Sequence, residues 1–195
     1  MTKLTLVEGL PKYDGINEAN AIADALNIMK KGLGVKRYKI LHVNSIRANT
    51  KQEFTKGLEK NTDFLHISSH GERDKDNTTY LYVTNGGCIY PHNIKELKIK
   101  AKVVFLNACL TSKRDMANAF LEANNPSFRF FIAPRNDVTF DEAFIVSLLF
   151  YRNAFLNSID FSSGKAVFKA LNKVYKLGDI RTKYSFWRTR GNGWK

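Results

Sequence analysis

Residues 102–108 read KVVFLNA, and residues 128–133 read FRFFIA. Each stretch is a nearly continuous apolar run of the length of a single strand. A strand with one face in water alternates polar and apolar residues, whereas a strand covered on both faces does not. Residues 113–123, between the two runs, are predicted to form a helix. The pair therefore predicts parallel strands in a sheet that helices cover on both sides.

The alternation of strands and helices continues outward from this unit. Further strands are expected at residues 3–7, 38–43, 63–69 and 184–190. Further helices are expected at residues 16–31, 50–59, 139–156 and 163–176. The rhythm breaks at residues 78–91, where two β-rich pieces surround Asn85-Gly86-Gly87, a hairpin signal. The pattern predicts one three-layer α/β/α domain over residues 1–195, with a mainly parallel central sheet and an inserted β-hairpin.

The composition narrows the class of protein. Hydrophobic residues make up 44% of the chain and aromatic residues 12%, which is typical of a packed globular protein rather than a disordered one. No apolar run reaches the roughly 20 residues that cross a bilayer, and the first residues lack the features of a signal peptide, so we expect a cytoplasmic protein. Cys88 and Cys109 cannot build a disulfide framework and lack metal-ligand spacing, so each is taken as a free thiol.

The net charge of +13 is concentrated at the C-terminal end. Residues 161–195 carry nine Lys or Arg against the single acid Asp179. A helix would place Lys165, Lys169 and Lys173 in one basic stripe. The residues after it mix arginines with four aromatic residues, Tyr184, Phe186, Trp187 and Trp194. Such a tail can bind a phosphate backbone through its cations and stack bases on its aromatic rings. Alternatively, it can be a solvated helix face followed by a closing strand.

Two residues with reactive side chains stand where core strands are expected to end. His70 follows the strand at residues 63–69, and Cys109 follows the strand at residues 102–108. Ligands of an open parallel sheet bind at the carboxyl ends of its strands. If these strands are neighbours, His70 and Cys109 project from the same edge, where the imidazole can share the thiol proton and then protonate a leaving group.

The backbone around both residues suits this chemistry. Gly71 allows close approach of another chain segment, and its N–H and that of Cys109 can donate to a developing oxyanion. Residues 110–112 lead toward a helix whose N-terminus would favour a thiolate. Alone, however, Cys109 would read as an inert buried thiol and His70 as a hydrogen-bonded core histidine.

Four blocks carry a resemblance to a known family. They are HISSHG at residues 66–71, VVFLNACLT at 103–111, IAPRNDVTFDEAF at 132–144 and LLFYRNAF at 148–155. In order and topology they resemble the caspase-like cysteine peptidases, most closely the bacterial CHAT peptidase group, over roughly residues 60–175. The resemblance implies a Cys-His dyad with Cys109 as nucleophile and His70 as general acid and base. It implies an oxyanion hole formed by the amides of Gly71 and Cys109.

The resemblance also implies a protein substrate, no cofactor, and a role in a bacterial stress or defence pathway. The chain departs from the group's pattern at Pro134-Arg135-Asn136, where relatives often have a tryptophan, and this leaves the substrate pocket open. It also lacks an attached regulatory module such as a helical repeat array, so we expect regulation by a separate protein or by self-association.

Substrate preference can be sketched from the block at residues 136–144, NDVTFDEAF. Asp137 and Asp141 would favour a basic residue before the scissile bond through charge pairing, although Arg135 lies beside them. Asp141 or Thr139 can equally serve as a helix cap.

His66 lies in the expected strand that His70 follows, and it can be a packed histidine or a partner of the catalytic residues. The two histidines cannot bind one metal ion together, because four residues of strand span about 13 Å.

A second function remains possible for the chain as a whole. The alternative to a peptidase is a non-catalytic α/β module that binds nucleic acid or an acidic protein through its basic C-terminal tail.

Overall fold

The computed structural model describes residues 2–32, 41–123, 129–156, 163–176, 182–190 and 193–194. The strands are β1 (Thr2–Glu8), β2 (Leu41–Arg47), β3 (Phe64–Ser68), β4 (His70–Arg73), β5 (Thr79–Val83), β6 (Gly87–Ile89), β7 (Val103–Asn107), β8 (Phe130–Pro134), β9 (Tyr184–Arg190) and β10 (Gly193–Trp194). The helices are α1 (Glu18–Gly32), α2 (Lys51–Leu58), α3 (Pro91–Lys95), α4 (Arg114–Glu122), α5 (Phe140–Leu156) and α6 (Gly164–Tyr175), with short 3-10 turns η1 (Lys12–Asp14) and η2 (Thr84–Gly86).

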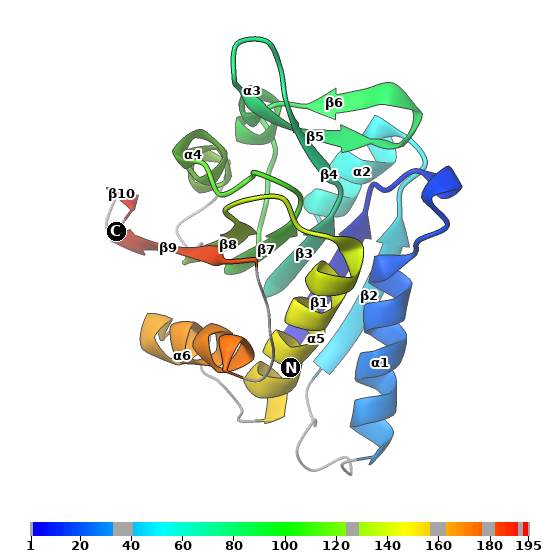
Figure 1. Ribbon diagram of the computed structural model, residues 1–195, viewed down its shortest axis with the longest axis vertical. Helices are drawn as coiled ribbons and strands as arrows, with labels where there is room; N and C mark the ends of the chain where they lie inside the picture. Colours follow the sequence, from blue (N-terminus) through cyan, green and yellow to red (C-terminus); the bar gives the residue numbers. More distant parts are fainter. Residues whose placement is uncertain are drawn as a thin grey trace.

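The central sheet has the strand order β10-β9-β8-β7-β3-β1-β2 (Figure 1). Strands β8, β7, β3, β1 and β2 are parallel, and β9 joins the β8 edge in the antiparallel direction. The predicted α/β fold with a mainly parallel sheet is therefore confirmed. The predicted hairpin is the β5–β6 pair, and β4 adds a third antiparallel strand to it, so the insertion is a small sheet of order β4-β5-β6.

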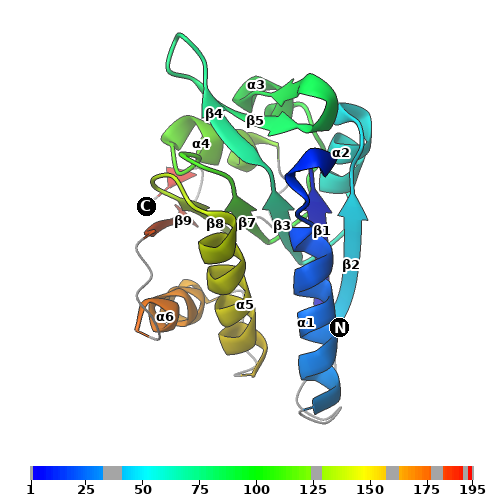
Figure 2. The ribbon, with the colours of Figure 1, turned by 45° about the vertical axis from the view of Figure 1, so that its right-hand side comes forward.

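Helices cover both faces of the central sheet (Figure 2). Helices α1, α5 and α6 share one apolar core with one face of the sheet, and α2, α3, α4 and the small sheet share the other. Successive residues of the inner strands face opposite cores, so all five residues of β3, β7 and β8 are buried. This explains why their sequences read as continuous apolar runs.

Several details differ from the predicted elements. Helix α3 was not predicted; Pro91 occupies its first position, and Asn93 Oδ1 accepts a hydrogen bond from the Tyr90 N–H at 3.1 Å. The predicted strand at residues 38–43 falls partly outside the described residues, and β2 continues to Arg47. In the described part of the chain, no helix combines the length and apolar character needed to cross a bilayer.

A buried polar network ties three elements to the end of β7. Asn107, the last residue of β7, is 3% exposed. Its side-chain NH₂ group lies 2.6 Å from the Glu18 carboxylate and 2.7 Å from Ser147 Oγ, and its Oδ1 accepts a hydrogen bond from the Tyr184 hydroxyl at 2.8 Å. These partners belong to α1, α5 and β9. The network therefore holds the strand end that leads directly to Cys109.

His66 belongs to the same buried region. It is fully buried, and its ring nitrogens lie 2.6 Å from the Tyr151 hydroxyl and 3.0 Å from Ser68 Oγ. Its ring also stacks on Phe105 with centroids 5.6 Å apart. This confirms the interpretation of His66 as a packed histidine.

Replacing Tyr184 with Phe tests how much this network contributes to stability. The change removes the hydroxyl that donates to Asn107 and leaves a buried acceptor without that partner, so we expect the free energy of unfolding to fall by about 1–2 kcal/mol. Chemical denaturation measures the difference. Tyr80→Phe is the matched control, because its hydroxyl donates to Glu72 near the surface, and a change below about 0.5 kcal/mol is expected there. Equal losses in the free energy of unfolding would contradict a special contribution from the buried Tyr184–Asn107 hydrogen bond.

Candidate active site

The pairing of β3 with β7 decides where His70 and Cys109 lie. The two strands are adjacent and parallel, with Ser68 opposite Asn107, and the Ser69 N–H donates to the Asn107 carbonyl at 3.0 Å. His70 and Cys109 each stand two residues beyond this matched pair. The two strands are therefore neighbours, which is the condition for His70 and Cys109 to share one edge, and the chain leaves the sheet at its carboxyl edge before both residues.

The backbones next to the two residues are in close contact. A Cβ built on Gly71 would lie 1.9 Å from the Cys109 carbonyl oxygen and 2.8 Å from the Cys109 nitrogen, distances that real side chains essentially never show. Only glycine fits at this position. The contact brings the amides of Gly71 and Cys109 into one small region, whereas their role as an oxyanion hole remains a prediction.

The chain turns sharply after Cys109. Leu110 has a φ of 61°, in the left-handed region that costs a non-glycine residue about 1–2 kcal/mol. Its N–H donates to the Asn136 carbonyl at 3.3 Å, and the Thr111 hydroxyl donates to the Ala108 carbonyl at 2.6 Å. These bonds hold the strained turn, which leaves Cys109 at the edge of the sheet. Backbone strain of this kind is concentrated at functional sites.

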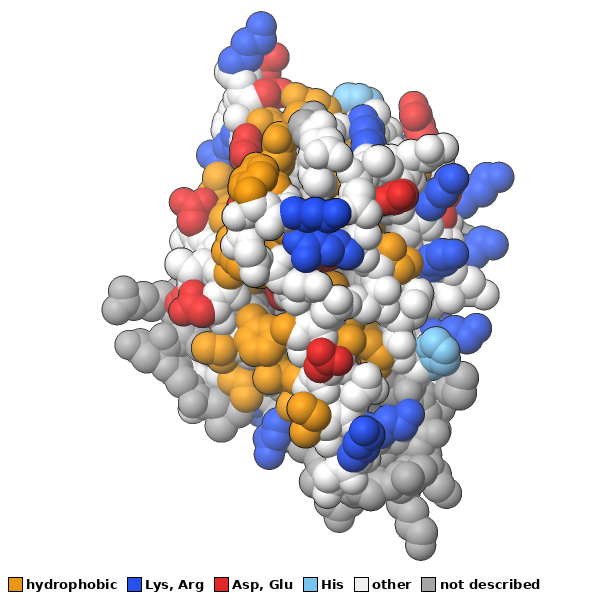
Figure 3. Space-filling model, turned by 90° about the vertical axis from the view of Figure 1, so that its right-hand side faces the viewer, with side chains coloured by type: hydrophobic (Ala, Val, Ile, Leu, Met, Phe, Trp, Pro, Cys, Tyr) orange, Lys and Arg blue, Asp and Glu red, His pale blue; other side chains and the backbone are white. Residues whose placement is uncertain are grey.

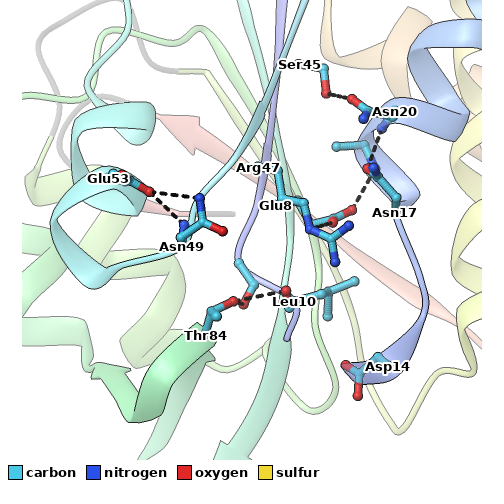
Figure 4. Close-up of polar contacts among 12 residues, drawn as sticks. Glu8, Leu10, Asp14, Asn17, Asn20, Ser45, Arg47, Asn49, Glu53 and Thr84 are labelled. Carbon is cyan, nitrogen blue, oxygen red and sulfur yellow. Dashed lines mark hydrogen bonds and ion pairs between the residues drawn. The ribbon is translucent and has the colours of Figure 1, made fainter. Parts of the chain in front are cut away.

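Asp14 is a site residue that sequence reasoning missed. Its Oδ2 lies 2.8 Å from His70 Nε2, and the two side chains are 15% and 32% exposed. Asp14 ends η1, the short turn that follows β1, and Figure 4 shows it at the tip of this segment. The only signal was the Asp14-Gly15 turn after the first strand. Its relevance depends on β1 lying beside β3, which the sequence pattern does not specify.

The Asp14 contact assigns different tasks to the two nitrogens of His70. Nε2 faces the carboxylate, which leaves Nδ1 as the nitrogen that can exchange a proton with a reacting group. The ring is further held by an edge contact with Phe140 at a centroid distance of 5.6 Å.

The Cys109 thiol is bonded to the segment between β8 and α5. Its Sγ lies 3.4 Å from the Val138 nitrogen and 3.5 Å from the Val138 carbonyl oxygen. Burial raises the pKa of the Cys109 thiol; the Val138 N–H opposes this rise, and the nearby Asp137 charge adds to it. Among the described residues, no hydrogen bond joins Cys109 directly to His70. Burial thus favours the protonated form of the thiol.

This finding corrects one expectation. Helix α4 begins only at Arg114, with Lys113 as its N-cap, and the pKa of the Cys109 thiol is raised rather than lowered. Burial of the sulfur therefore outweighs the predicted lowering of the thiol pKa by a helix N-terminus.

The structure separates the two predicted substrate-binding carboxylates. Asp137 is exposed and directly precedes Val138, which touches the thiol. Asp141 is exposed in the first turn of α5, where hydrogen bonds from the Thr139 hydroxyl and the Glu142 N–H lower the pKa of its carboxyl. Arg135 Nε donates to Ser185 Oγ at 2.9 Å, so this guanidinium is engaged toward β9. Substrate binding by either aspartate stays a prediction.

Comparison with known proteins identifies a family model that matches the chain. A family model described as the caspase domain matches residues 6–166, which include every site residue discussed above. No curated protein matches the chain at a significant level.

The pH dependence of alkylation tests the state of the thiol. In a Cys88→Ser background only Cys109 can react with iodoacetamide. We expect the rate to rise with pH around a midpoint above that of a free thiol, because burial raises the pKa of Cys109 and only the thiolate reacts. An unstructured peptide of residues 105–113 provides the reference midpoint. A protein midpoint below that of the peptide would contradict the described burial.

Proposed function

The chain belongs to the caspase-domain family, whose members are cysteine peptidases, and from this premise we propose that it is a cysteine endopeptidase with Cys109 as nucleophile and His70 as general acid and base. One observation carries the proposal: both residues stand two positions beyond a matched pair on adjacent parallel strands. The Gly71 backbone against Cys109 supports it, because this contact keeps the two strand ends together.

The reaction can be written for these residues. His70 Nδ1 accepts the Cys109 thiol proton, and the thiolate attacks the carbonyl carbon of the scissile peptide bond. The resulting oxyanion accepts hydrogen bonds from the Gly71 and Cys109 amides. The C–N bond then breaks as His70 gives its proton to the departing amine. Water, deprotonated by His70, attacks the thioester, which releases the carboxylic acid product and restores the thiol.

Asp14 has a positioning role in this scheme. Its carboxylate holds Nε2 of His70, so the ring presents Nδ1 to the reaction in each half-reaction. The Asp-Gly turn presents the carboxylate from the strand next to β3. The dyad thereby becomes a Cys-His-Asp arrangement.

The Val138 contact supports a regulated enzyme. A thiol that is half-buried and bonded to the Val138 backbone must lose these bonds before it can transfer its proton to His70. We infer that a regulatory protein or self-association raises the basal activity of the chain by shifting the 135–139 segment. The likeness to the CHAT group, a cytoplasmic location, and a role in a bacterial stress or defence pathway are further parts of this proposal.

The charges around the thiol favour a substrate with Arg or Lys before the scissile bond. Asp137 is exposed and close enough to Cys109 to influence the pKa of its thiol, whereas Arg135 is engaged by Ser185. Asp141 is already bonded within the first turn of α5, so Asp137 is the stronger candidate. Charge pairing with a basic substrate residue follows from this arrangement.

A peptide library tests the proposed activity. The parent chain is expected to cleave after Arg or Lys, and Cys109→Ala is expected to lose at least about 10³-fold in rate, because the nucleophile is gone. Mass spectrometry of the products gives both the rate and the cleavage position. Cys88→Ala is the matched control and should keep the parent rate. Cleavage that persists in Cys109→Ala would exclude this mechanism.

Asp14→Asn tests the positioning role. Asparagine keeps the shape but removes the charge, so we expect kcat to fall by at least about tenfold with KM nearly unchanged. Asp14→Glu should recover part of the loss. Steady-state kinetics with a library-derived substrate measures the effect, and chemical denaturation checks that the fold is intact. A change confined to KM would instead place Asp14 in substrate binding.

A further inference from the structure

Helix α6 is an unusually basic element. Its buried face packs into the core through Val167, Ala170, Leu171 and Val174, while Lys165, Lys169 and Lys173 are all exposed on the opposite side. The predicted stripe therefore exists as a surface. None of the described salt bridges involves these three lysines, and α6 contains no Asp or Glu.

This charge pattern is unfavourable for the isolated helix. Lys165 and Lys169 are like charges four residues apart, as are Lys169 and Lys173, and such pairs destabilise a helix. Lys165 also lies in the first turn, where the helix dipole disfavours a cation. The face that carries α1 and β2 differs, because its Lys and Arg side chains lie among Asp and Glu (Figure 3). A bound polyanion would relieve the repulsion along α6.

An aromatic row reaches the surface beside this stripe. Phe130 is buried and stacks on Phe186 with centroids 5.3 Å apart, and Phe186 lies 5.5 Å from Phe168. Phe168 is 47% exposed and lies three residues after Lys165 on α6, so the two side chains are neighbours on the helix surface. The row thus places an exposed ring beside the lysine stripe. Such a ring is suited to stacking the base of a nucleotide whose phosphates pair with the lysines.

Strand β9 extends the basic surface. Arg188 is exposed, and its Cδ would lie 3.0 Å from a Cβ built on Gly164, so its side chain lies across the start of α6. Residues 182–190 contain no acid. Trp187, by contrast, faces the opposite core and does not join this surface. The side chains of residues 189–195, including the predicted Trp194, lie outside the described part of the chain.

The geometry points to a binding site for single-stranded nucleic acid on the surface formed by Lys165, Phe168, Lys169, Lys173 and Arg188. Single strands are favoured over duplexes because their unpaired bases can stack on Phe168. The site is separate from the proposed active site. Arg188 pairs with Phe130 at the amino end of β8, whereas His70 and Cys109 lie beyond the carboxyl ends of β3 and β7.

Fluorescence anisotropy with a labelled oligodeoxythymidine tests the site in the full chain. We expect Lys165→Gln/Lys169→Gln/Lys173→Gln to weaken binding at least about tenfold at about 50 mM salt and to reduce the salt slope by about 2. Phe168→Ala should weaken it about tenfold. The matched control, Lys51→Gln/Lys56→Gln/Lys60→Gln, removes three exposed charges beside α2 and should bind like the parent.

Further measurements make the result decisive. The α6 triple variant should unfold at the same or a higher denaturant concentration, since like-charge repulsion is removed. Duplex DNA should bind more weakly than the single strand. The site is overturned if the oligonucleotide does not bind, if the α6 and α2 triple variants weaken it equally, or if Phe168→Ala changes nothing. Tighter binding of a polyglutamate peptide, insensitive to Phe168→Ala, would also overturn it by indicating an acidic protein partner.

Discussion

The parallel pairing of β3 with β7 is the contact on which the rest of the site depends. It sets Ser68 opposite Asn107, so the chain segments beyond these residues leave the sheet together. The two segments then meet at a distance that only glycine allows, with the Gly71 backbone against that of Cys109. A slip of one residue in this register would turn the side chains of one strand to the other face and separate His70 from Cys109.

The polar groups below this edge hold it in a defined arrangement. Asn107 connects β7 to α1, α5 and β9 through buried hydrogen bonds. On β1, the Glu8 carboxylate accepts the Ala19 N–H at 2.9 Å and lies 3.3 Å from Arg47 Nε, and burial raises the pKa of this carboxyl (Figure 4). Because buried polar groups are costly unless they are paired, these bonds favour one position of the strand ends and of the loop that holds Asp14.

The molecule thus separates two kinds of chemistry. The carboxyl edge of the sheet presents a half-buried thiol, an imidazole and a carboxylate that come from three strand ends. The surface of α6 presents exposed lysines beside an aromatic ring and lies toward the opposite end of β8 and β9. A nucleic acid on the second surface would leave the first open to a peptide. The two surfaces can therefore act together in one chain.

Local patterns in the sequence determined much of this protein. The apolar runs at residues 102–108 and 128–133 indicated strands buried on both faces, and the placement of His70 and Cys109 at strand ends followed from where those runs stop. The spacing of Lys165, Lys169 and Lys173 likewise indicated a basic helix face, because helical periodicity depends only on neighbours along the chain.

Only the tertiary structure decided which strand ends meet. Asp14 contacts His70 across 56 residues of sequence, and Val138 contacts Cys109 across 29. Both contacts depend on the order of strands in the sheet and on the path of connecting segments, which residue periodicity does not encode. The raised pKa of the Cys109 thiol also depends on tertiary contacts. Cys109 lies at a strand end that the sequence identifies, but the segments that bury its sulfur are brought there by the fold.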